Sequence, residues 1–256
     1  MTFFGRTEPG PLSLRHALAT VHRDQFWWLH CGGYGLATLV GLGLPLAAGF
    51  VMESLDNSRR GFATPLPPPG NITVRSLTGL FALLIDFAFL VLPILIGTML
   101  LFVTGIAMLL AGVTDELIIQ RITSSVVLGT GMVVVLLFLS SVAPAGRLRF
   151  AREGHIEDAL RSATLRWTLG RANRRTFFQA RLLSLVAYLP AVLLSVLTLG
   201  LARITFPGHM VVLGLGLWLI LSAIIYAHLV VVQLYVSAER QIQEHQVQQD
   251  ALQCEV

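Results

Sequence analysis

Two ionisable side chains interrupt long apolar segments of this sequence. Asp86 is the one charged residue in the 39 positions from Ser76 to Thr114, and His228 lies within the apolar segment 210–238. A charge at membrane depth is costly unless it finds a partner or water. A carboxyl group beside an imidazole can pass a proton or hold a cation. The same two residues also fit a packing hydrogen bond, or a neutral aspartic acid bonded to a backbone carbonyl.

The elements that hold these residues are membrane helices. Hydrophobic residues make up 55% of the 256 residues and charged residues 12%, about half the charged share of a soluble domain. The mean hydropathy is +0.74. Apolar segments of about 18 or more residues indicate transmembrane helices. We predict an all-α, polytopic membrane helix bundle with spans at about 26–52, 76–114, 122–146, 182–202 and 210–238.

The number of spans depends on the segment 76–114. Its 39 residues would measure about 58 Å as one helix, nearly twice the hydrocarbon thickness. One span followed by a re-entrant piece gives five spans, whereas two short spans turning between Pro93 and Thr98 give six. Arginine counting does not separate these models, because each places 13 arginines inside and 5 outside. A repeated Pro-x-Ala-Gly-like stop, in "LPLAAG" and "VAPAG", favours five.

In the five-span model, Asp86 and His228 lie at matching depth. Each is eight positions from the cytoplasmic end of its span, or about 12 Å by helical rise. We therefore predict that Asp86 faces the bundle interior and that His228 is its nearest ionisable partner. In the six-span model the two residues fall toward opposite faces and cannot pair.

Positive charge gathers in one connector. Nine arginines lie between Arg147 and Arg181 against three acidic residues, so the positive-inside rule places the segment 147–181 in the cytoplasm. After Gly154 the spacing predicts an amphipathic helix at the headgroup boundary, supported by a Glu157–Arg161 pair. Its predicted apolar face consists of Ile156, Ala159, Leu160 and Ala163. The residues predicted to meet anionic headgroups are Arg147, Arg149, Arg152 and Arg161. A solvated connector that only fixes topology is the alternative.

The chain divides into three parts. A polar N-terminal segment, 1–25, precedes one transmembrane domain, 26–238, which contains the interfacial connector. The segment 239–256 is a glutamine-rich tail that we expect to extend the last helix into the cytoplasm. We predict a multi-pass protein of the cell (inner) membrane with a cytoplasmic C-terminus.

The sequence motifs of common enzymes are absent from the sequence. It contains no phosphate-binding loop, no HExxH zinc motif, no GxSxG nucleophile elbow and no CxxC pair. Its two cysteines, Cys31 and Cys254, lie at opposite ends of the chain and imply no zinc site. We predict no catalytic residues, no metal and no cofactor. The arginines are explained by the membrane, and without interleaved aromatic residues they do not indicate nucleic-acid binding.

Several segments resemble a known family. They are the aromatic "DQFWW" before a glycine-rich segment, the later "NSRRG", the "LP" pairs inside apolar segments, and "RFAREGHIEDAL". Together, over roughly residues 20–200, they resemble a family of bacterial and archaeal multi-pass membrane proteins known only as a domain of unknown function. Phe150 stands where that family leads us to expect a tyrosine. The resemblance implies the membrane architecture and transfers no catalytic residue.

These observations favour a non-enzymatic integral membrane protein. The leading prediction is an accessory or structural subunit of a membrane complex, with anionic lipid headgroups and other membrane subunits as partners. The alternative is a small proton-linked or cation transporter or channel that uses Asp86 and His228. A transporter usually needs several polar groups or broken helices at the midplane, and the sequence supplies one pair and one proline-interrupted segment.

Overall fold

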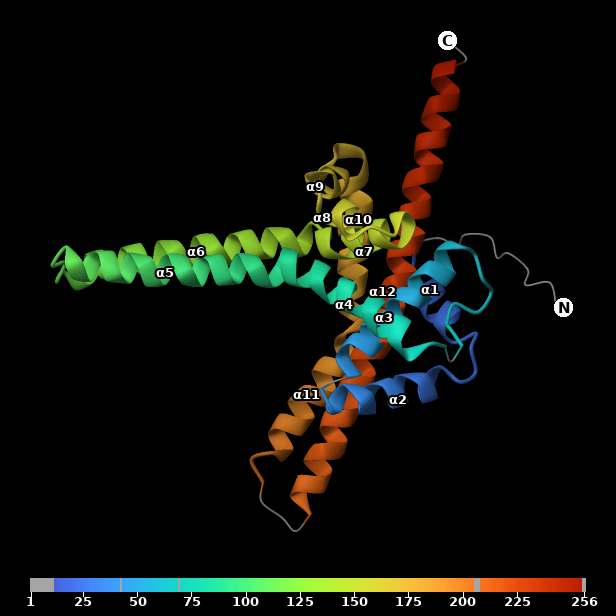
Figure 1. Cartoon of the computed structure of the whole chain (residues 1–256), viewed down its shortest axis with the longest axis horizontal. Coiled ribbons are helices and arrows are strands. Elements are labelled where there is room, and N and C mark those ends of the chain that lie inside the picture. Colours follow the sequence, from blue (N-terminus) through green and yellow to red (C-terminus); the bar gives the residue numbers. More distant parts are fainter. Residues whose placement is uncertain (1–11, 42, 69, 205–207, 255–256) are drawn as a thin grey trace.

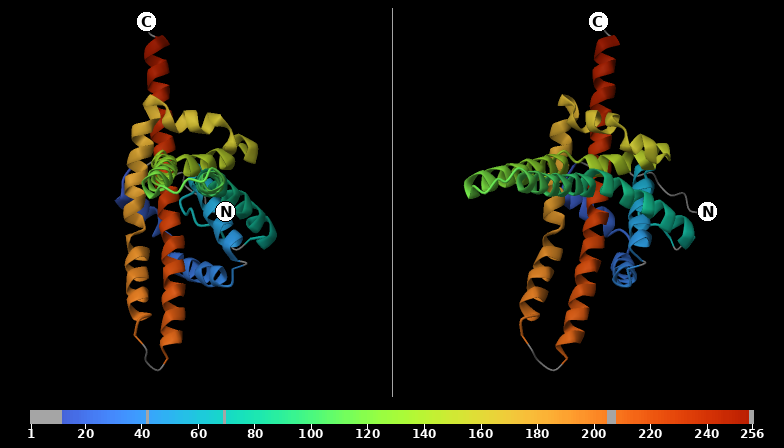
Figure 2. Two further views of the ribbon diagram at one scale, coloured as in Figure 1. Left: turned by 90° about the vertical axis from the view of Figure 1, so that its left-hand side faces the viewer. Right: turned by 60° about the vertical axis from the view of Figure 1, so that its left-hand side comes forward.

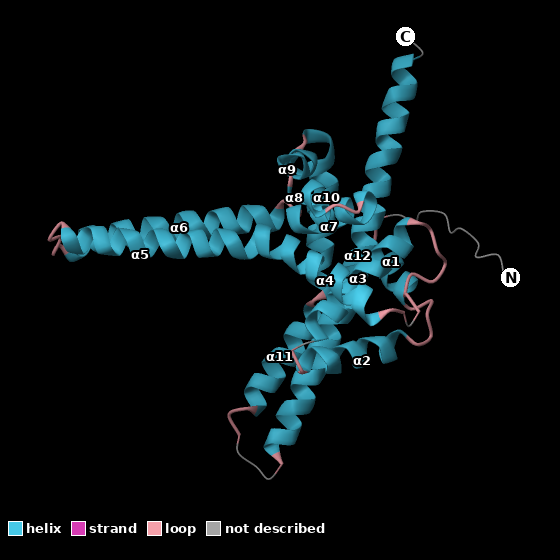
Figure 3. Ribbon diagram, viewed as in Figure 1, coloured by secondary structure: helices cyan, strands magenta, loops and turns pink. Residues whose placement is uncertain are grey.

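All regular secondary structure in the described residues is helical (Figures 1 and 3). The computed structural model describes residues 12–41, 43–68, 70–204 and 208–254. The helices are α1 (Leu14–Val21), α2 (Trp27–Leu39), α3 (Gly43–Arg59), α4 (Ile72–Asp86), η1 (Phe87–Val91), α5 (Leu92–Leu110), α6 (Glu116–Leu139), α7 (Val142–Glu153), α8 (Ile156–Leu160), α9 (Ser162–Leu169), α10 (Arg171–Ala187), α11 (Leu189–Leu201) and α12 (His209–Cys254).

Four helical segments are long and apolar enough to cross a membrane. They are Ile72–Leu110, Glu116–Leu139, Arg171–Leu201 and His209–Gln248. The all-α membrane architecture predicted from the sequence therefore holds. Each of the four corresponds to one of the five predicted spans, and the predicted span 26–52 is not among them.

The segment 26–52 forms two helices instead of one span. α2 ends at Leu39, α3 begins at Gly43, and Gly41 between them has a φ of 82°. Glycine adopts this left-handed conformation without the steric cost that other residues meet. The 13 residues of α2 measure about 20 Å, which is short of the roughly 30 Å of a hydrocarbon core.

The segment Ile72–Leu110 is helical throughout and bends at η1 (Figure 1). η1 is a short π-helical turn, in which the Leu92 N–H donates to the Phe87 carbonyl, five residues back. Pro93 follows directly; it has no N–H, and its ring crowds the carbonyl four residues earlier, so a widened turn accommodates it. The six-span alternative required a turn between Pro93 and Thr98, but these residues are helical within α5, and the chain reverses only after Leu110.

Two helical hairpins leave the body of the protein in different directions. α5 and α6 project to one side, whereas α11 and the first part of α12 extend downward in Figure 1. Every residue of α6 is described, and none of them is buried. In α5, whose residues are also all described, the one buried residue is Gly97. A Cβ atom on Gly97 would lie 2.1 Å from the Thr130 side chain, so this glycine lets the two helices approach closely.

α12 is the central helix of the body. α1, α2, α3, α7, α10 and α11 all pack against it, and Figure 2 shows α10 and α11 alongside it in both views. The fully buried Tyr235 donates its hydroxyl to Ser141 Oγ at 2.8 Å, and Ser141 donates to the Phe177 carbonyl at 3.1 Å. These bonds join α12 to the start of α7 and to α10. Ser141 itself has a positive φ of 59°.

The connector forms short helices instead of one amphipathic helix. α8 ends at Leu160 because Arg161 is extended, with φ −63° and ψ 151°. Of the predicted apolar face, Ala159 is buried, whereas Ala163 falls in α9 and is exposed. Arg161 also pairs with Asp158, at 2.8 Å, and not with Glu157 as the sequence predicted. The break after Leu160 changes which side chains share a face.

α3 and α4 form the closest helix crossing of the body. A Cβ atom on Gly79 would lie 1.7 Å from the Pro45 carbonyl oxygen, and one on Gly49 would lie 1.8 Å from the Arg75 carbonyl oxygen. Both obstacles are backbone atoms, which cannot rotate away. Small residues at such positions are what allow membrane helices to pack closely.

We expect Gly79→Ala to destabilise the protein. The added methyl group must push α3 and α4 apart, at a cost of about 1–3 kcal/mol. Gly131→Ala is the matched control, since a Cβ atom there meets nothing within 4 Å; it should gain up to about 1 kcal/mol from helix propensity. Thermal unfolding in detergent micelles measures both. Equal stability of the two variants would contradict the close crossing.

Candidate functional site

The central polar contact of the body is an ion pair between Asp86 and Arg147. The Arg147 Nε–H donates to Asp86 Oδ1 at 3.0 Å, and the Nη2 amino group contacts Oδ2 closely. The arginine side chain is 14% exposed and the aspartate side chain 26% exposed. Asp86 is the last residue of α4 and Arg147 lies in α7, so the pair joins the two helices at the bend.

This pairing corrects the sequence prediction for Asp86. His228 was expected as its nearest ionisable partner, but the structure places the Arg147 guanidinium there. α7 begins directly after Ser141 and packs against α4, which brings into the body an arginine that the sequence assigned to lipid headgroups. A guanidinium satisfies both carboxylate oxygens at once and stays charged, so it competes well against an imidazole.

His228 lies in the same cavity as the ion pair. Its Nδ1 atom is 2.9 Å from the Ile224 carbonyl oxygen, which fixes the proton on that nitrogen. The Tyr188 ring meets its ring edge-on, with centroids 5.4 Å apart. Asp86, Arg147 and His228 all line a cavity of about 600 Å³. The structure therefore brings together the two residues predicted to share a site, with an arginine paired to the carboxylate.

Arg181 is a functional candidate that sequence reasoning passed over. It is buried, and its Nε–H donates to the Phe138 carbonyl at 2.8 Å. Its guanidinium lies 4.1 Å from the centre of the Phe138 ring and also lines the cavity. Its position directly before the apolar segment 182–202 was the signal that it could enter the membrane.

The charges of the lining favour an anion. Arg147 and Arg181 contribute two positive charges and Asp86 one negative charge, which leaves one net positive charge beside apolar walls. A cation would have to compete with Arg147 for the Asp86 carboxylate. An acidic group, by contrast, can approach Arg181, whose hydrogen bond to Phe138 uses only Nε.

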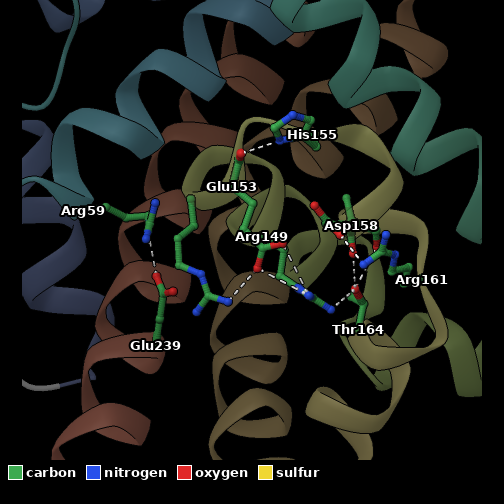
Figure 4. A network of polar contacts seen from close by, with 10 residues as sticks. Arg59, Arg149, Glu153, His155, Asp158, Arg161, Thr164 and Glu239 are labelled. Carbon is green, nitrogen blue, oxygen red and sulfur yellow. Dashed lines mark hydrogen bonds and ion pairs between the residues drawn. The ribbon is translucent and has the colours of Figure 1, made fainter.

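The other predicted headgroup arginines belong to a polar network on α7–α9 (Figure 4). Arg149 donates to Thr164 at 3.2 Å and to Glu153 at 3.3 Å, and Arg152 donates to the same carboxylate at 2.7 Å. The side chain of Arg152 is 47% exposed and that of Arg161 is 64% exposed. These two side chains are exposed, whereas Arg147 and Arg149 are turned toward protein partners, and the contact with lipid headgroups stays a prediction for Arg152 and Arg161.

We expect Asp86→Leu to cost about 2–3 kcal/mol of unfolding free energy, because it strands the Arg147 charge in a mostly apolar place. Asp86→Asn should cost less, and the double variant Asp86→Leu/Arg147→Met should recover most of the loss. Asp158→Leu is the control and should cost less than about 1 kcal/mol, since its partner Arg161 is exposed. A double variant as unstable as Asp86→Leu alone would contradict the pairing.

The pH dependence of Glu153 gives a separate test. The hydrogen bond from Arg152, together with the nearby charge of Arg149, lowers the pKa of Glu153 below its ordinary value of 4.5. The folded state therefore favours the carboxylate, and this stabilisation is present above pH 4.5 and lost as the pH falls through the lowered pKa.

Accordingly, Glu153→Gln should lower stability at pH 7 by about 0.5–1 kcal/mol, with little difference from the parent protein at pH 3. Unfolding temperatures of both proteins at the two pH values measure this. The exposed Glu157 supplies the control, because Glu157→Gln should behave like the parent at both. A difference that persists at pH 3 would show that the network does not depend on this charge.

Comparison with known protein families finds one match. Residues 35–199 fit the family described as "Protein of unknown function (DUF4013)". This segment is more than half of the chain and includes Asp86, Arg147 and Arg181, whereas His228 lies beyond it. Comparisons with curated proteins and with solved structures find no match. The resemblance to a family known only as a domain of unknown function is confirmed, and the chain belongs to the DUF4013 family.

Proposed function

We propose that this protein is a non-enzymatic integral membrane protein that binds an anionic amphipathic molecule in the cavity beside Asp86 and Arg147. In this proposal the C-terminus lies in the cytoplasm of a cell with an inner membrane. The ligand carries an acidic head, either a carboxylate or a phosphate, and a hydrocarbon chain. The observation that carries the proposal is the net positive charge in the lining of a largely apolar cavity.

The cavity supplies partners for both parts of such a ligand. The acidic head lies beside Arg181, where the guanidinium donates charge-assisted hydrogen bonds. Tyr188 and His228 complete the polar end. The chain follows Val192 and Val196 of α11, which line the cavity and are also exposed on the outer surface of the protein. A lipid can therefore reach the cavity sideways from the bilayer.

A proton-linked or cation transporter is the competing function. It needs an acidic group that can bind a proton or cation, and Asp86 is the carboxyl group in this cavity. The contacts of Arg147 with both carboxylate oxygens occupy that carboxylate, so a cation would have to displace the guanidinium. The pairing therefore supports ligand binding over transport.

An accessory role in a membrane complex is compatible with lipid binding. The exposed apolar surface of α6 supports it, since a helix without buried residues within its own chain can meet lipid or another subunit. Most of this surface is apolar, and the charged residues of the helix, Glu116 and Arg121, lie near its N-terminal end.

Native mass spectrometry of the purified protein tests the proposal. Phosphatidylglycerol should be retained in preference to phosphatidylcholine, because the cavity favours an acidic group. Arg181→Gln should weaken that preference about tenfold, the worth of one charge-assisted hydrogen bond, while Arg181→Lys should keep most of it. Equal retention of the two lipids would overturn the proposal, and displacement by inorganic phosphate would point to a free anion as the ligand.

A pair of variants on α11 tests where the chain lies. Val196 and Leu199 are each 65% exposed, but Val196 lines the cavity and Leu199 does not. We expect Val196→Trp to reduce phosphatidylglycerol retention by blocking the chain, and Leu199→Trp to leave it unchanged. Equal effects would place the bound lipid elsewhere on the surface.

A further inference from the structure

A second cavity lies on another part of α12, away from the ion pair. Its volume is about 610 Å³, and it is lined by residues of α2, α11 and α12. Three of the four tryptophans of the chain line it, together with Tyr226. Neither an acidic nor a basic residue contributes to the described lining, which sets this cavity apart from the one beside Arg181.

Three polar groups of this lining, those of Trp218, Ser222 and Tyr226, are already bonded within the protein. The Trp218 indole N–H donates to the Gly32 carbonyl at 2.9 Å, and Ser222 donates to the Trp218 carbonyl at 2.8 Å. The Tyr226 hydroxyl is 3.0 Å from His22 Nε2. These three groups are therefore not available to a ligand, and the aromatic faces are left to contact apolar atoms.

Two glycines of α2 determine the shape of the space beside α12. A Cβ atom on Gly35 would lie 2.3 Å from Ser222 Oγ, so this glycine lets α2 approach α12 closely. Gly33, in contrast, lines the cavity and would have nothing within 4 Å of an added Cβ atom. The space in front of Gly33 is therefore available to a ligand.

The cavity is continuous with exposed apolar surface of the protein. Trp28, Leu29 and Leu36 line it and are exposed on the outside of the protein. On α11, Leu194 also contributes, and α11 belongs to one of the four segments able to cross a membrane. An apolar molecule in the bilayer therefore reaches the aromatic residues without crossing a polar barrier.

We infer that this cavity binds the hydrocarbon chain of a membrane lipid and does not recognise its head group. The volume lies within the range of small-molecule sites, which is about 300–1,000 Å³. Because no charged group lines it, neutral and acidic ligands with the same chain bind equally. This site is independent of the proposed anionic site, which selects the head.

Tryptophan fluorescence reports on this cavity directly. In the triple variant Trp27→Phe, Trp28→Phe, Trp167→Phe, the emission comes from Trp218 alone. Bromine quenches indole at contact, so the probes are 1-bromododecane and 12-bromododecanoic acid, titrated into the protein in detergent. We expect saturable quenching near one equivalent, with equal midpoints for both probes. Quenching that rises without saturation, or that requires the carboxylate, would overturn the inference.

Gly33→Leu in the same background fills the cavity and should abolish the saturable phase. Gly131→Leu is the control, since this helical glycine also has open space around it but lies on α6. A saturable phase that survives Gly33→Leu, in a protein with parental unfolding temperature, would also overturn the inference. If Gly33→Leu lowers the unfolding temperature, Ala223→Phe blocks the same cavity from α12. Arg181→Gln should leave this quenching unchanged, which separates the result from that of the anionic site.

Discussion

The ion pair between Asp86 and Arg147 is the constraint on which the arrangement of this protein depends. An unpaired carboxylate or guanidinium at membrane depth would cost several kcal/mol, so the two helices that carry them must meet. Their meeting fixes the end of α4 against the middle of α7, beside the π-helical turn. The cavity that contains Arg181 and His228 is bounded by the same contact. A shift of either helix would expose one charge and open the cavity.

α12 satisfies polar groups of its neighbours along its length. Its Arg240 donates to the Ser58 carbonyl near the end of α3, and Glu239 pairs with Arg59 there. Helix ends leave carbonyls without partners, and where water is scarce a side chain from a packed helix is an effective donor. Farther along, α12 contributes to two cavities of similar size but opposite chemistry, one with arginines and one with aromatic residues. The place of each cavity along α12 follows from the residues of the neighbouring helices that face α12 there.

The apolar segments and the inward position of Asp86 could be predicted from the sequence, because burial of apolar area and the cost of a lone charge act locally. The partner of Asp86 could not, since it depends on the packing of α7 against α4, 61 residues away in the chain. Arg147 looked like a headgroup contact because it opens an arginine-rich segment. The segment 26–52 is divided into two helices at one left-handed glycine, Gly41, although its apolar composition is continuous. Arg181 was not predicted to be a site residue, because it was counted among the arginines of the connector.

The hairpin of α5 and α6 is attached to the body only at its base, and both attachments are irregular: the π-helical turn on one side and the left-handed Ser141 on the other. The 24 residues of α6 extend about 36 Å from that base. A change of angle at the base therefore moves the tip of the hairpin much farther than the base. A rotation of about 10° at the base displaces its tip by about 6 Å, more than one turn of helix. Small backbone changes next to Asp86 are thereby magnified at the far end of the molecule.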